Sequence, residues 1–596
     1  MNKIFERLSS LRRMMCEEHI DAFVFPSTDP HNGEYVPDHW MGRQWISGFN
    51  GSAGTAVITL HEAALWTDSR YFIAAAEQLN GTEYVLMKEA VEGTPTIAQW
   101  LAMKLSLSGG SCVGIDGMVT AASEVEGLIA DLRSAAGITV RTNLDPLSEI
   151  WKDRPEIPLS MVEIQPEEYA GESVKSKLSR IRKAIRDTHA NGMLVTALDE
   201  IAWTLNLRGT DVHCNPVFVS YLLIQENEAT LFIDERKLSA EVQVYLHANG
   251  VKVLPYGDVT AALKKYKDYS ILMSSTSTCF TLFNSVKAKV IDVPSPIAVM
   301  KAVKNDAEIC GFRNAMRRDG VALVKFLRWL LPAVQSGKET EMSIDRKLSS
   351  LRAEQPLYRD ISFDTIAGYE SHGAIVHYEA TPETDATLRP EGFLLLDSGA
   401  QYQDATTDIT RTIALGPVTE EQCRVYTLVL KGNIQLAMLK FPDGASGTQL
   451  DALARMDMWR EGMNYLHGTG HGVGSYLNVH EGPHQIRMQW KPTPLRAGMT
   501  VTDEPGLYLE GRFGVRTENT MLITPYKETE FGKFLQMEAL TLCPIDTSPI
   551  VMSMMRKEEI EWLNGYHLRV RKELLPLLED EADRLWLIEN TQPLTL

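Results

Sequence analysis

The sequence predicts a protein of mixed α/β class that is divided into three domains. Its 596 residues exceed what a single hydrophobic core organises, because cores stop growing at roughly 250 to 300 residues. Short apolar stretches alternate with helical patterns near the N-terminus, and similar features recur further along the chain. We expect the domains to span residues 1–155, 156–304 and 305–596.

The first of these domains begins with strand and helix patterns in alternation. Residues 21–27 (DAFVFPS) and 55–60 (TAVITL) read as apolar strands, and residues 70–79 (RYFIAAAEQL) read as a helix with apolar positions on one face. The Pro-containing stretch over residues 151–158 (WKDRPEIP) is typical of a linker. It places the end of the domain near residue 155.

The second domain repeats features of the first. Residues 65–70 (LWTDSR) are echoed by residues 231–237 (LFIDERK), in which Leu231, Asp234 and Arg236 stand at a constant offset of 166. This favours a duplicated α/β domain, with chance similarity of two such folds as the alternative. Prolines break the pattern after residue 290, and a helix is predicted from Asp306 through Leu331 at the start of the third domain.

Composition and charge exclude several classes of function. No apolar run approaches the roughly 18 residues of a membrane span. The net charge of −19 disfavours a nucleic-acid partner, since such proteins need a basic surface; the excess acid serves solubility or, alternatively, substrate steering. The N-terminus lacks the apolar stretch of a secretory signal, and seven scattered cysteines form no disulfide framework. We therefore expect a cytoplasmic protein.

The first candidate site residues are two aspartates at strand ends. Residues 392–415 (GFLLLDSGAQYQDATTDITRTIAL) predict a strand ending at Asp397, a polar turn and a second strand beginning at Asp408. In a hairpin both carboxylates would point to one place and repel each other unless a cation lay between them. Taken alone, either aspartate is better explained by a hydrogen-bonded turn than by a metal site.

Histidines and glutamates further along strengthen the cation hypothesis. Residues 465–483 (YLHGTGHGVGSYLNVHEGP) place His467, His471 and His480 in a Gly-rich stretch. Residues 499–509 (MTVTDEPGLYL) predict a strand that closes on Glu504 before a Pro-Gly turn. A lone glutamate at a strand end is usually just solvated, so this position matters only as one of a set.

One more alternating strand is predicted over residues 513–524 (FGVRTENTMLIT), with Arg516 and Glu518 on one face. The combined set of four carboxylates and one imidazole suits hard or borderline divalent ions, and the lack of thiolates argues against structural zinc. Manganese or cobalt fits, with zinc as a further alternative. Two such ions would lower the pKa of a water between them and stabilise a tetrahedral oxyanion, which is hydrolase chemistry.

These residues resemble a known family. The motifs GAIVHY, LLLDSGAQYQDATTDITRT, HGTGHGVGSYLNVHEGP, VTDEPG and GVRTEN are similar to those of the pita-bread metallopeptidases, and specifically of the aminopeptidase P family. The resemblance extends upstream to FNGSAGTAVIT, WTDSRYF and ALDEIAWTLNLRGTDVHCNPVF, and so covers nearly the whole chain. It implies two creatinase-like N-terminal α/β domains followed by a pita-bread catalytic domain with a helical C-terminal tail.

The resemblance also implies a role for each residue. Asp397 would bind one metal ion, His471 the other, and Asp408 and Glu518 would bridge them; Glu504 would bind metal and act as general base toward the bridging water. His377, His467 and His480 would line the substrate site and stabilise the oxyanion. Arg516 would orient a bridging carboxylate next to the substrate. Arg70 would reach the substrate from the N-terminal domain, with a surface salt bridge as the alternative.

By the same resemblance, the enzyme would remove one N-terminal residue from peptides whose second residue is proline, and would work as a homodimer. The bond to proline has no N–H and a fixed ring, so it needs a dedicated pocket. The runner-up is a prolidase restricted to dipeptides, which the additional second domain disfavours. The third hypothesis is a catalytically inactive scaffold, which usually lacks the ligand residues that this sequence retains.

Overall fold

The computed structural model describes residues 2–105 and 110–595. The described chain forms two compact units. The first unit runs to Gln165 and resumes over Glu172–Ile297. The second unit comprises Pro166–Gly171 and the chain from Ala298 onward.

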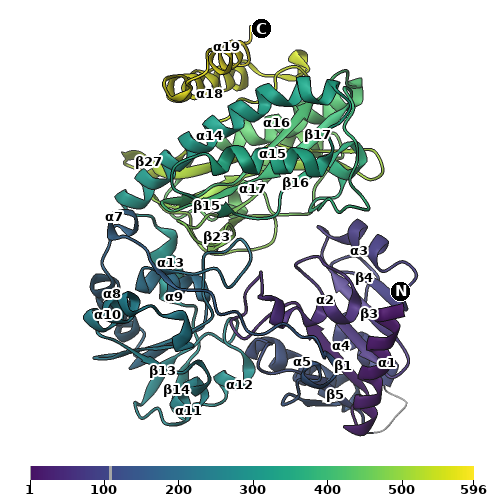
Figure 1. The fold of residues 1–596 in the computed structure, drawn as a ribbon, viewed down its shortest axis with the longest axis vertical. Coiled ribbons are helices and arrows are strands. Elements are labelled where there is room, and N and C mark those ends of the chain that lie inside the picture. Colours follow the sequence, from purple (N-terminus) through teal and green to yellow (C-terminus); the bar gives the residue numbers. More distant parts are fainter. Residues whose placement is uncertain (1, 106–109, 596) are drawn as a thin grey trace. The chain divides into compact units, whose positions relative to one another are not determined.

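The N-terminal part of the first unit is built on a mixed sheet with strand order β4-β3-β2-β1-β5-β6 (Figure 1). β1 pairs antiparallel with β2 and parallel with β5, and the expected strands over residues 21–27 and 55–60 are β1 and β2. The expected helix is α3 (Phe72–Gln78). The strands are β1 (Ala22–Pro26), β2 (Thr55–Thr59), β3 (Ala63–Thr67), β4 (Tyr84–Lys88), β5 (Cys112–Ile115) and β6 (Thr139–Arg141).

Helices cover both faces of this sheet because the strands are apolar on both sides. Leu8 and Leu11 of α1 (Asn2–Glu17) and Ile46 of α2 (Gly42–Ser47) pack in one cluster with side chains of the sheet. Leu101 of α4 (Ile97–Leu105) and Val125 of α5 (Ala122–Ala136) pack in a second cluster, on Val57 and other strand residues. This three-layer arrangement buries one hydrophobic cluster on each face of the sheet.

The second part of the first unit repeats this sheet with strand order β12-β11-β10-β8-β13-β14. Parallel and antiparallel pairs follow one another as in the first sheet, and β3 and β11, in which the repeated sequence motif begins, hold equivalent places. The expected duplication is therefore confirmed, whereas the boundaries near residues 155 and 304 stay predictions. The strands are β8 (Gly192–Val195), β10 (Tyr221–Gln225), β11 (Ala229–Phe232), β12 (Val251–Leu254), β13 (Ser270–Leu272) and β14 (Lys289–Ile291).

The second unit begins with a long helix, α14 (Asp306–Gln335). Asn305 caps it, because its side chain accepts the N–H of Glu308 while the Glu308 side chain accepts the N–H of Asn305. The helix was expected to Leu331 and continues past Pro332, whose missing N–H removes only one bond close to the helix end. The other main helices are α15 (Glu341–Ala353), α16 (Glu420–Ala437), α17 (Gly447–Arg460), α18 (Lys557–Leu574) and α19 (Glu581–Glu589).

Curved antiparallel strands lie beneath these helices (Figure 1). One sheet has the order β16-β17-β20 and another has the order β21-β28-β27-β24. Their strands are β16 (Ile366–Tyr369), β17 (Phe393–Ser398), β20 (Ile409–Ala414), β21 (Lys440–Pro442), β24 (Thr500–Asp503), β27 (Asn519–Thr529) and β28 (Gly532–Ala539). A third sheet has the order β15-β18-β19, with β15 (Tyr358–Ile361), β18 (Ala400–Tyr402) and β19 (Ala405–Thr406). The unit also contains two short pairs, β22 (Gly470–Gly472) with β23 (Glu481–Ile486) and β25 (Gly506–Leu509) with β26 (Phe513–Arg516).

The structure corrects two details of the expected strands. The single strand over residues 513–524 is interrupted at Thr517 and Glu518, because β26 pairs with β25 whereas β27 pairs with β24 and β28. Gly506, expected in a turn, begins β25. The expected helical tail is present, and Leu563, Tyr566, Val570 and Leu574 of α18 are buried in the core of the unit. Among the described residues, none of the helices has the length and apolar character needed to cross a bilayer.

Candidate metal centre

Asp397 and Asp408 come together because the strands that carry them pair. β17 and β20 are antiparallel, with Asp397 opposite Thr410 and Asp408 directly before β20. The connection contains the short strands β18 (Ala400–Tyr402) and β19 (Ala405–Thr406), so the hairpin is less direct than the sequence suggested. Both carboxylates are buried.

The hydroxyl of Thr502 connects His471 and Glu504 beside these aspartates. The backbone N–H of His471 donates to Thr502 Oγ1 (3.1 Å), and that hydroxyl donates to Glu504 Oε1 (3.1 Å). The Glu504 N–H donates to the carbonyl of Thr469 (2.8 Å). β22 and the end of β24 therefore present an imidazole and a carboxylate side by side.

Glu518 joins the group from the break between β26 and β27. Its N–H donates to the carbonyl of Thr410 (3.0 Å), and Thr410 Oγ1 donates to Glu518 Oε2 (2.8 Å). The residue is 1% exposed. The change of sheet at this point thus turns the Glu518 carboxylate inward against β20.

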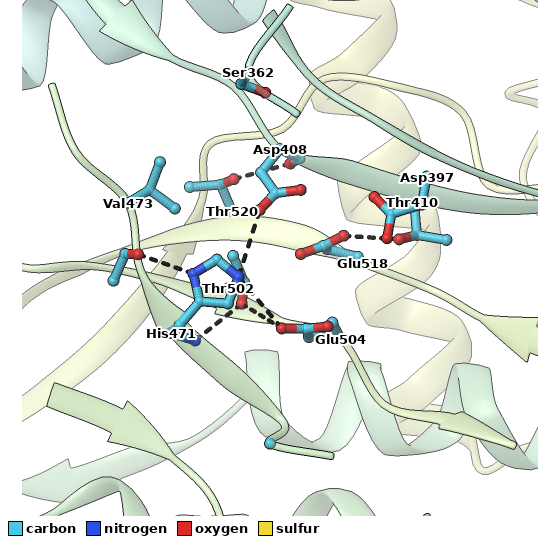
Figure 2. A network of polar contacts seen from close by, with 12 residues as sticks. Ser362, Asp397, Asp408, Thr410, His471, Val473, Thr502, Glu504, Glu518 and Thr520 are labelled. Atoms are coloured by element: carbon cyan, nitrogen blue, oxygen red, sulfur yellow. Dashed lines mark hydrogen bonds and ion pairs between the residues drawn. The ribbon is translucent and has the colours of Figure 1, made fainter. Parts of the chain in front are cut away.

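The side chains of Asp408, His471, Glu504 and Glu518 lie close together. Potential ligand atoms of Asp408, His471 and Glu518 all lie within 4.8 Å of one another. His471 Nε2 is 3.5 Å from Asp408 Oδ2 and 3.5 Å from Glu504 Oε1. Figure 2 shows the carboxylates of Asp408, Glu504 and Glu518 around the His471 ring, with Asp397 beyond Glu518.

The His471 tautomer can be assigned from its neighbours. Nδ1 lies 2.9 Å from the carbonyl oxygen of Gly472, and a carbonyl oxygen only accepts. Nδ1 therefore carries a hydrogen, and in the neutral form of the ring the lone pair lies on Nε2, toward Asp408 and Glu504. This is the arrangement of a histidine prepared to bind a metal ion through Nε2.

The carboxylates are electrostatically incompatible without a cation. Burial, and then the charge of Asp397, raise the pKa of Asp408 well above its ordinary value. Burial, and then the charge of Asp408, do the same to the pKa of Glu518. The pKa of Glu504 rises to about 7, mainly through burial, although Arg516 opposes the rise. Positive charge placed between these groups would relieve their repulsion.

Arg516 supplies one fixed positive charge. It is 1% exposed, and it donates from Nε and Nη2 to Asp397 Oδ2 (3.1 and 2.7 Å) and from Nη1 to Tyr508 Oη (2.7 Å). The expected partner was a bridging carboxylate, Asp408 or Glu518, and the structure corrects this to Asp397. The reason is that Asp397 stands opposite Thr410, whose hydroxyl also accepts from Arg516 Nε (3.1 Å).

The donor set fits divalent metal ions. In the described part of the chain, the buried Oδ1 of Asp397 has no hydrogen-bond partner, although Oδ2 of the same group is held by Arg516. Buried carboxylate oxygens are normally satisfied, so the orphaned atom marks a place for a cation. Carboxylates with one imidazole suit manganese, cobalt or zinc.

The structure also places the expected substrate-site histidines. The rings of His480 and His471 are 4.3 Å apart and nearly perpendicular. His467 lies one step further out, with Nε2 2.8 Å from Tyr508 Oη, which connects it through Arg516 to Asp397. His377 is half-buried in the segment after β16, where the hydroxyl of the next residue, Tyr378, donates to Glu341 Oε2 (2.9 Å).

Arg70 belongs to the first unit and is held by acidic neighbours there. Its Nη2 is 2.8 Å from Asp68 Oδ2 and its Nη1 is 3.5 Å from Glu34 Oε1. These ion pairs are the ones expected if Arg70 serves only in a surface salt bridge. They also keep the guanidinium in one orientation, as a binding role would require.

Sequence reasoning missed residues that orient the cluster: Thr410, Thr502 and Tyr508. The two threonines could have been found from strand periodicity, because in a strand residues two apart share a face. Thr410 is two residues from Asp408, and Thr502 is two residues from Glu504. Tyr508 had no comparable signal, since its partners His467 and Arg516 come from other strands and loops.

Comparisons with known proteins agree with this geometry. Profiles described as creatinase/prolidase N-terminal domain match residues 7–149 and 153–308, metallopeptidase family M24 matches residues 311–525, and the C-terminal region of peptidase M24 matches residues 533–594. A probable Xaa-Pro aminopeptidase P of Aspergillus niger is 39% identical over 99% of this chain and 99% of its own length.

Two further proteins extend the match. Aminopeptidase P2 of Arabidopsis thaliana is 39% identical over 99% of this chain and 88% of its own length. A crystal structure of X-prolyl aminopeptidase from Caenorhabditis elegans, described as a cytosolic enzyme with a di-nuclear active site, covers both chains completely with a TM-score of 0.95 and 34% identity. From its duplicated N-terminal folds, its carboxylate cluster and these relatives, the chain belongs to the aminopeptidase P family of M24 metallopeptidases.

Proposed function

We propose that this protein is a metal-dependent X-Pro aminopeptidase, which releases the first residue of peptides that carry proline second. The observation that supports this most is the convergence of four carboxylates, three of them buried, and one imidazole, in which Asp397 retains an unsatisfied oxygen. The relatives named X-Pro aminopeptidase span the same length of chain.

Two divalent ions would be held by the cluster. Asp397 would bind one, His471 would bind the other through Nε2, Asp408 and Glu518 would be shared, and Glu504 would complete the set. We propose manganese, with cobalt and zinc as alternatives. When bound, the ions would supply Lewis acidity toward water and the substrate carbonyl.

The remaining chemistry belongs to the side chains. Thr502 fixes Oε1 of Glu504, which leaves the rest of that carboxylate to accept the proton of the attacking water. His480, beside His471, would donate to the substrate carbonyl as it gains negative charge. His467, whose ring nitrogens contact the Gly468 carbonyl and Tyr508 Oη, would line the substrate site. We assign His377 and Arg70 to substrate binding as well. Arg516 acts through Asp397, because both are enclosed.

The proline nitrogen sets the specificity problem. It has no N–H, so a site that recognises an extended backbone through a hydrogen bond from this nitrogen cannot bind it.

The test of the proposed function is incubation of the manganese-loaded protein with Arg-Pro-Pro and with Gly-Pro. Release of arginine from the tripeptide is expected; cleavage of Gly-Pro alone would assign a dipeptidase instead, and cleavage of neither with less than one bound ion per chain would assign an inactive scaffold.

We also propose that the protein is a cytoplasmic homodimer. Four large apolar side chains are exposed near α17 and β23: Trp459, Leu466, Met488 and Trp490. Exposed apolar surface of this kind is common at protein interfaces. Sedimentation equilibrium would give twice the chain mass for a dimer, and fractionation of the source cells would test the cytoplasmic assignment that the cytosolic Caenorhabditis elegans enzyme suggests.

A further inference from the structure

A cluster of buried ion pairs lies next to His480, whose ring contacts that of His471. Glu481, the first residue of β23, binds two lysines: Lys301 Nζ is 2.5 Å from its Oε2, and Lys304 Nζ contacts its Oε1. All three side chains are 3% exposed or less. We call these three residues the lysine clamp. Burial of charges is costly in free energy, so the clamp is poorly explained by stability alone.

The clamp joins segments that are far apart in the sequence. Lys301 and Lys304 precede α14, and the segment between them is tied to the entry of β24: the Lys304 N–H donates to the carbonyl of Gly498 (2.9 Å), and Val303 pairs with Met499. β24 leads directly to Glu504. The lysines therefore fix β23 against the strand that carries the proposed general base.

His480 is attached directly to the clamped residue. Because it precedes Glu481, the position of its Cα is set by the backbone that Glu481 anchors. Its ring lies 4.3 Å from that of His471. On the opposite strand, Gly472 pairs with Glu481, and a side chain at Gly472 would meet the carbonyl of Glu481 at 2.6 Å. The contact between β22 and β23 is thus tight at the clamped residue.

We propose that Glu481, held by Lys301 and Lys304, is a positioning residue that keeps the His480 imidazole in place beside His471 for the reaction. This inference rests on the proposed peptidase function, in which His480 donates to the substrate carbonyl. Such a donor must be held within about 0.5 Å of its productive position, which a loop residue achieves only with rigid support.

The test uses lysine variants of matched chemistry. Lys301→Met removes one ammonium and leaves Glu481 paired with Lys304, so the fold should survive. Lys431→Met is the control, because Lys431 is another buried ammonium of the second unit and binds Glu559 (2.8 Å) and Asp457 (3.2 Å) on the side of α18. With Arg-Pro-Pro, Lys301→Met should lower kcat by about tenfold or more with KM changed less than about threefold, while Lys431→Met keeps kcat within about twofold.

Three readouts separate positioning from a general structural effect. Lys301→Met should retain two manganese ions per chain, and Lys301→Arg, which keeps the charge, should recover most of the lost kcat. In a double-mutant cycle with His480→Ala, addition of Lys301→Met should lower kcat no further than about twofold, because the residue that the clamp positions is already absent. If Lys301→Met does not fold, Glu481→Asp takes its place in the same cycle with the same expectations.

The proposal is overturned if Lys301→Met keeps the parent kcat, or if its effect is equally large with and without His480. Absence of arginine release by the parent protein is a different result. That outcome would remove the proposed function itself, before any variant is compared.

Discussion

Arg516 holds one oxygen of Asp397, while the other oxygen, which is buried, has no hydrogen-bond partner among residues 2–105 and 110–595. The guanidinium thus orients the carboxylate and leaves Oδ1 for a cation. Replacement by lysine would keep a positive charge but cannot reach Asp397, Thr410 and Tyr508 together. Residues that orient metal ligands typically contribute 10-fold to 100-fold to metal affinity.

We therefore predict that Arg516→Lys lowers manganese affinity by roughly 10-fold to 100-fold. Isothermal titration of the metal-free protein measures this directly. Arg512→Lys is the control, since Arg512 pairs with Glu421 at the surface. Equal affinities in Arg516→Lys and the parent would contradict the assignment of Asp397 as a ligand.

Glu504→Gln should nearly abolish turnover. The amide keeps the size of the side chain, but it cannot accept the proton of the attacking water and is a poorer ligand. General-base catalysis contributes about 100-fold to 10,000-fold, so kcat for Arg-Pro-Pro should fall by at least about 100-fold. Glu510→Gln, in the exposed turn between β25 and β26, should retain the parent rate. Activity of Glu504→Gln within tenfold of the parent would show that another group accepts the proton.

Much of this site could be anticipated from the sequence, and the limits have physical causes. Strand patterns around Asp397, Asp408 and Glu504 marked carboxylates at strand ends, and the glycines near His471 marked a tight approach. The break at Glu518 was missed because it depends on which sheet each half of the segment joins. The partner of Arg516 was assigned wrongly because it lies 119 residues away and is selected by strand register.

Arg70 of the first unit provides a test of the proposed role in substrate binding. Arg70→Ala should raise KM for Arg-Pro-Pro more than it lowers kcat, if the guanidinium contributes binding to ground state and transition state alike. Arg236→Ala is a suitable control, since Arg236 pairs with Asp234 in the repeated motif of the duplicated domain. Unchanged KM in Arg70→Ala would reduce the role of Arg70 to its ion pairs with Asp68 and Glu34.

His484 predicts a pH dependence of stability. It is fully buried, Nε2 donates to the carbonyl of Thr500 (2.7 Å), and burial lowers its pKa to about 4 from an ordinary value of 6.5. Below pH 6.5 the His484 imidazole is protonated in the unfolded chain, whereas in the folded chain it stays neutral down to about pH 4. The free energy of unfolding therefore decreases as the pH drops through this window. The loss should approach about 3 kcal/mol at the acid end.

The measurement is the difference in Tm between pH 7.5 and pH 5, compared for the parent and His484→Gln, whose amide can still donate to Thr500. The variant should lose less Tm on acidification than the parent does. His61→Gln, at an exposed position, should behave like the parent. An unchanged acid loss in His484→Gln would mean that other groups dominate the titration.

Removal of metal should affect stability as well as activity, because the carboxylates that repel one another are part of the fold. Chelation with EDTA should abolish arginine release and lower Tm, and manganese should restore both. At a free metal concentration of 100 times Kd, one site contributes about 2.7 kcal/mol to the free energy of unfolding.

Magnesium should restore less of the activity and of the Tm than manganese does. It prefers oxygen ligands and loses its bound water reluctantly, whereas His471 presents nitrogen. Full activity of the chelated protein, verified as metal-free by elemental analysis, would refute a metal role for Asp397, Asp408, His471, Glu504 and Glu518 together.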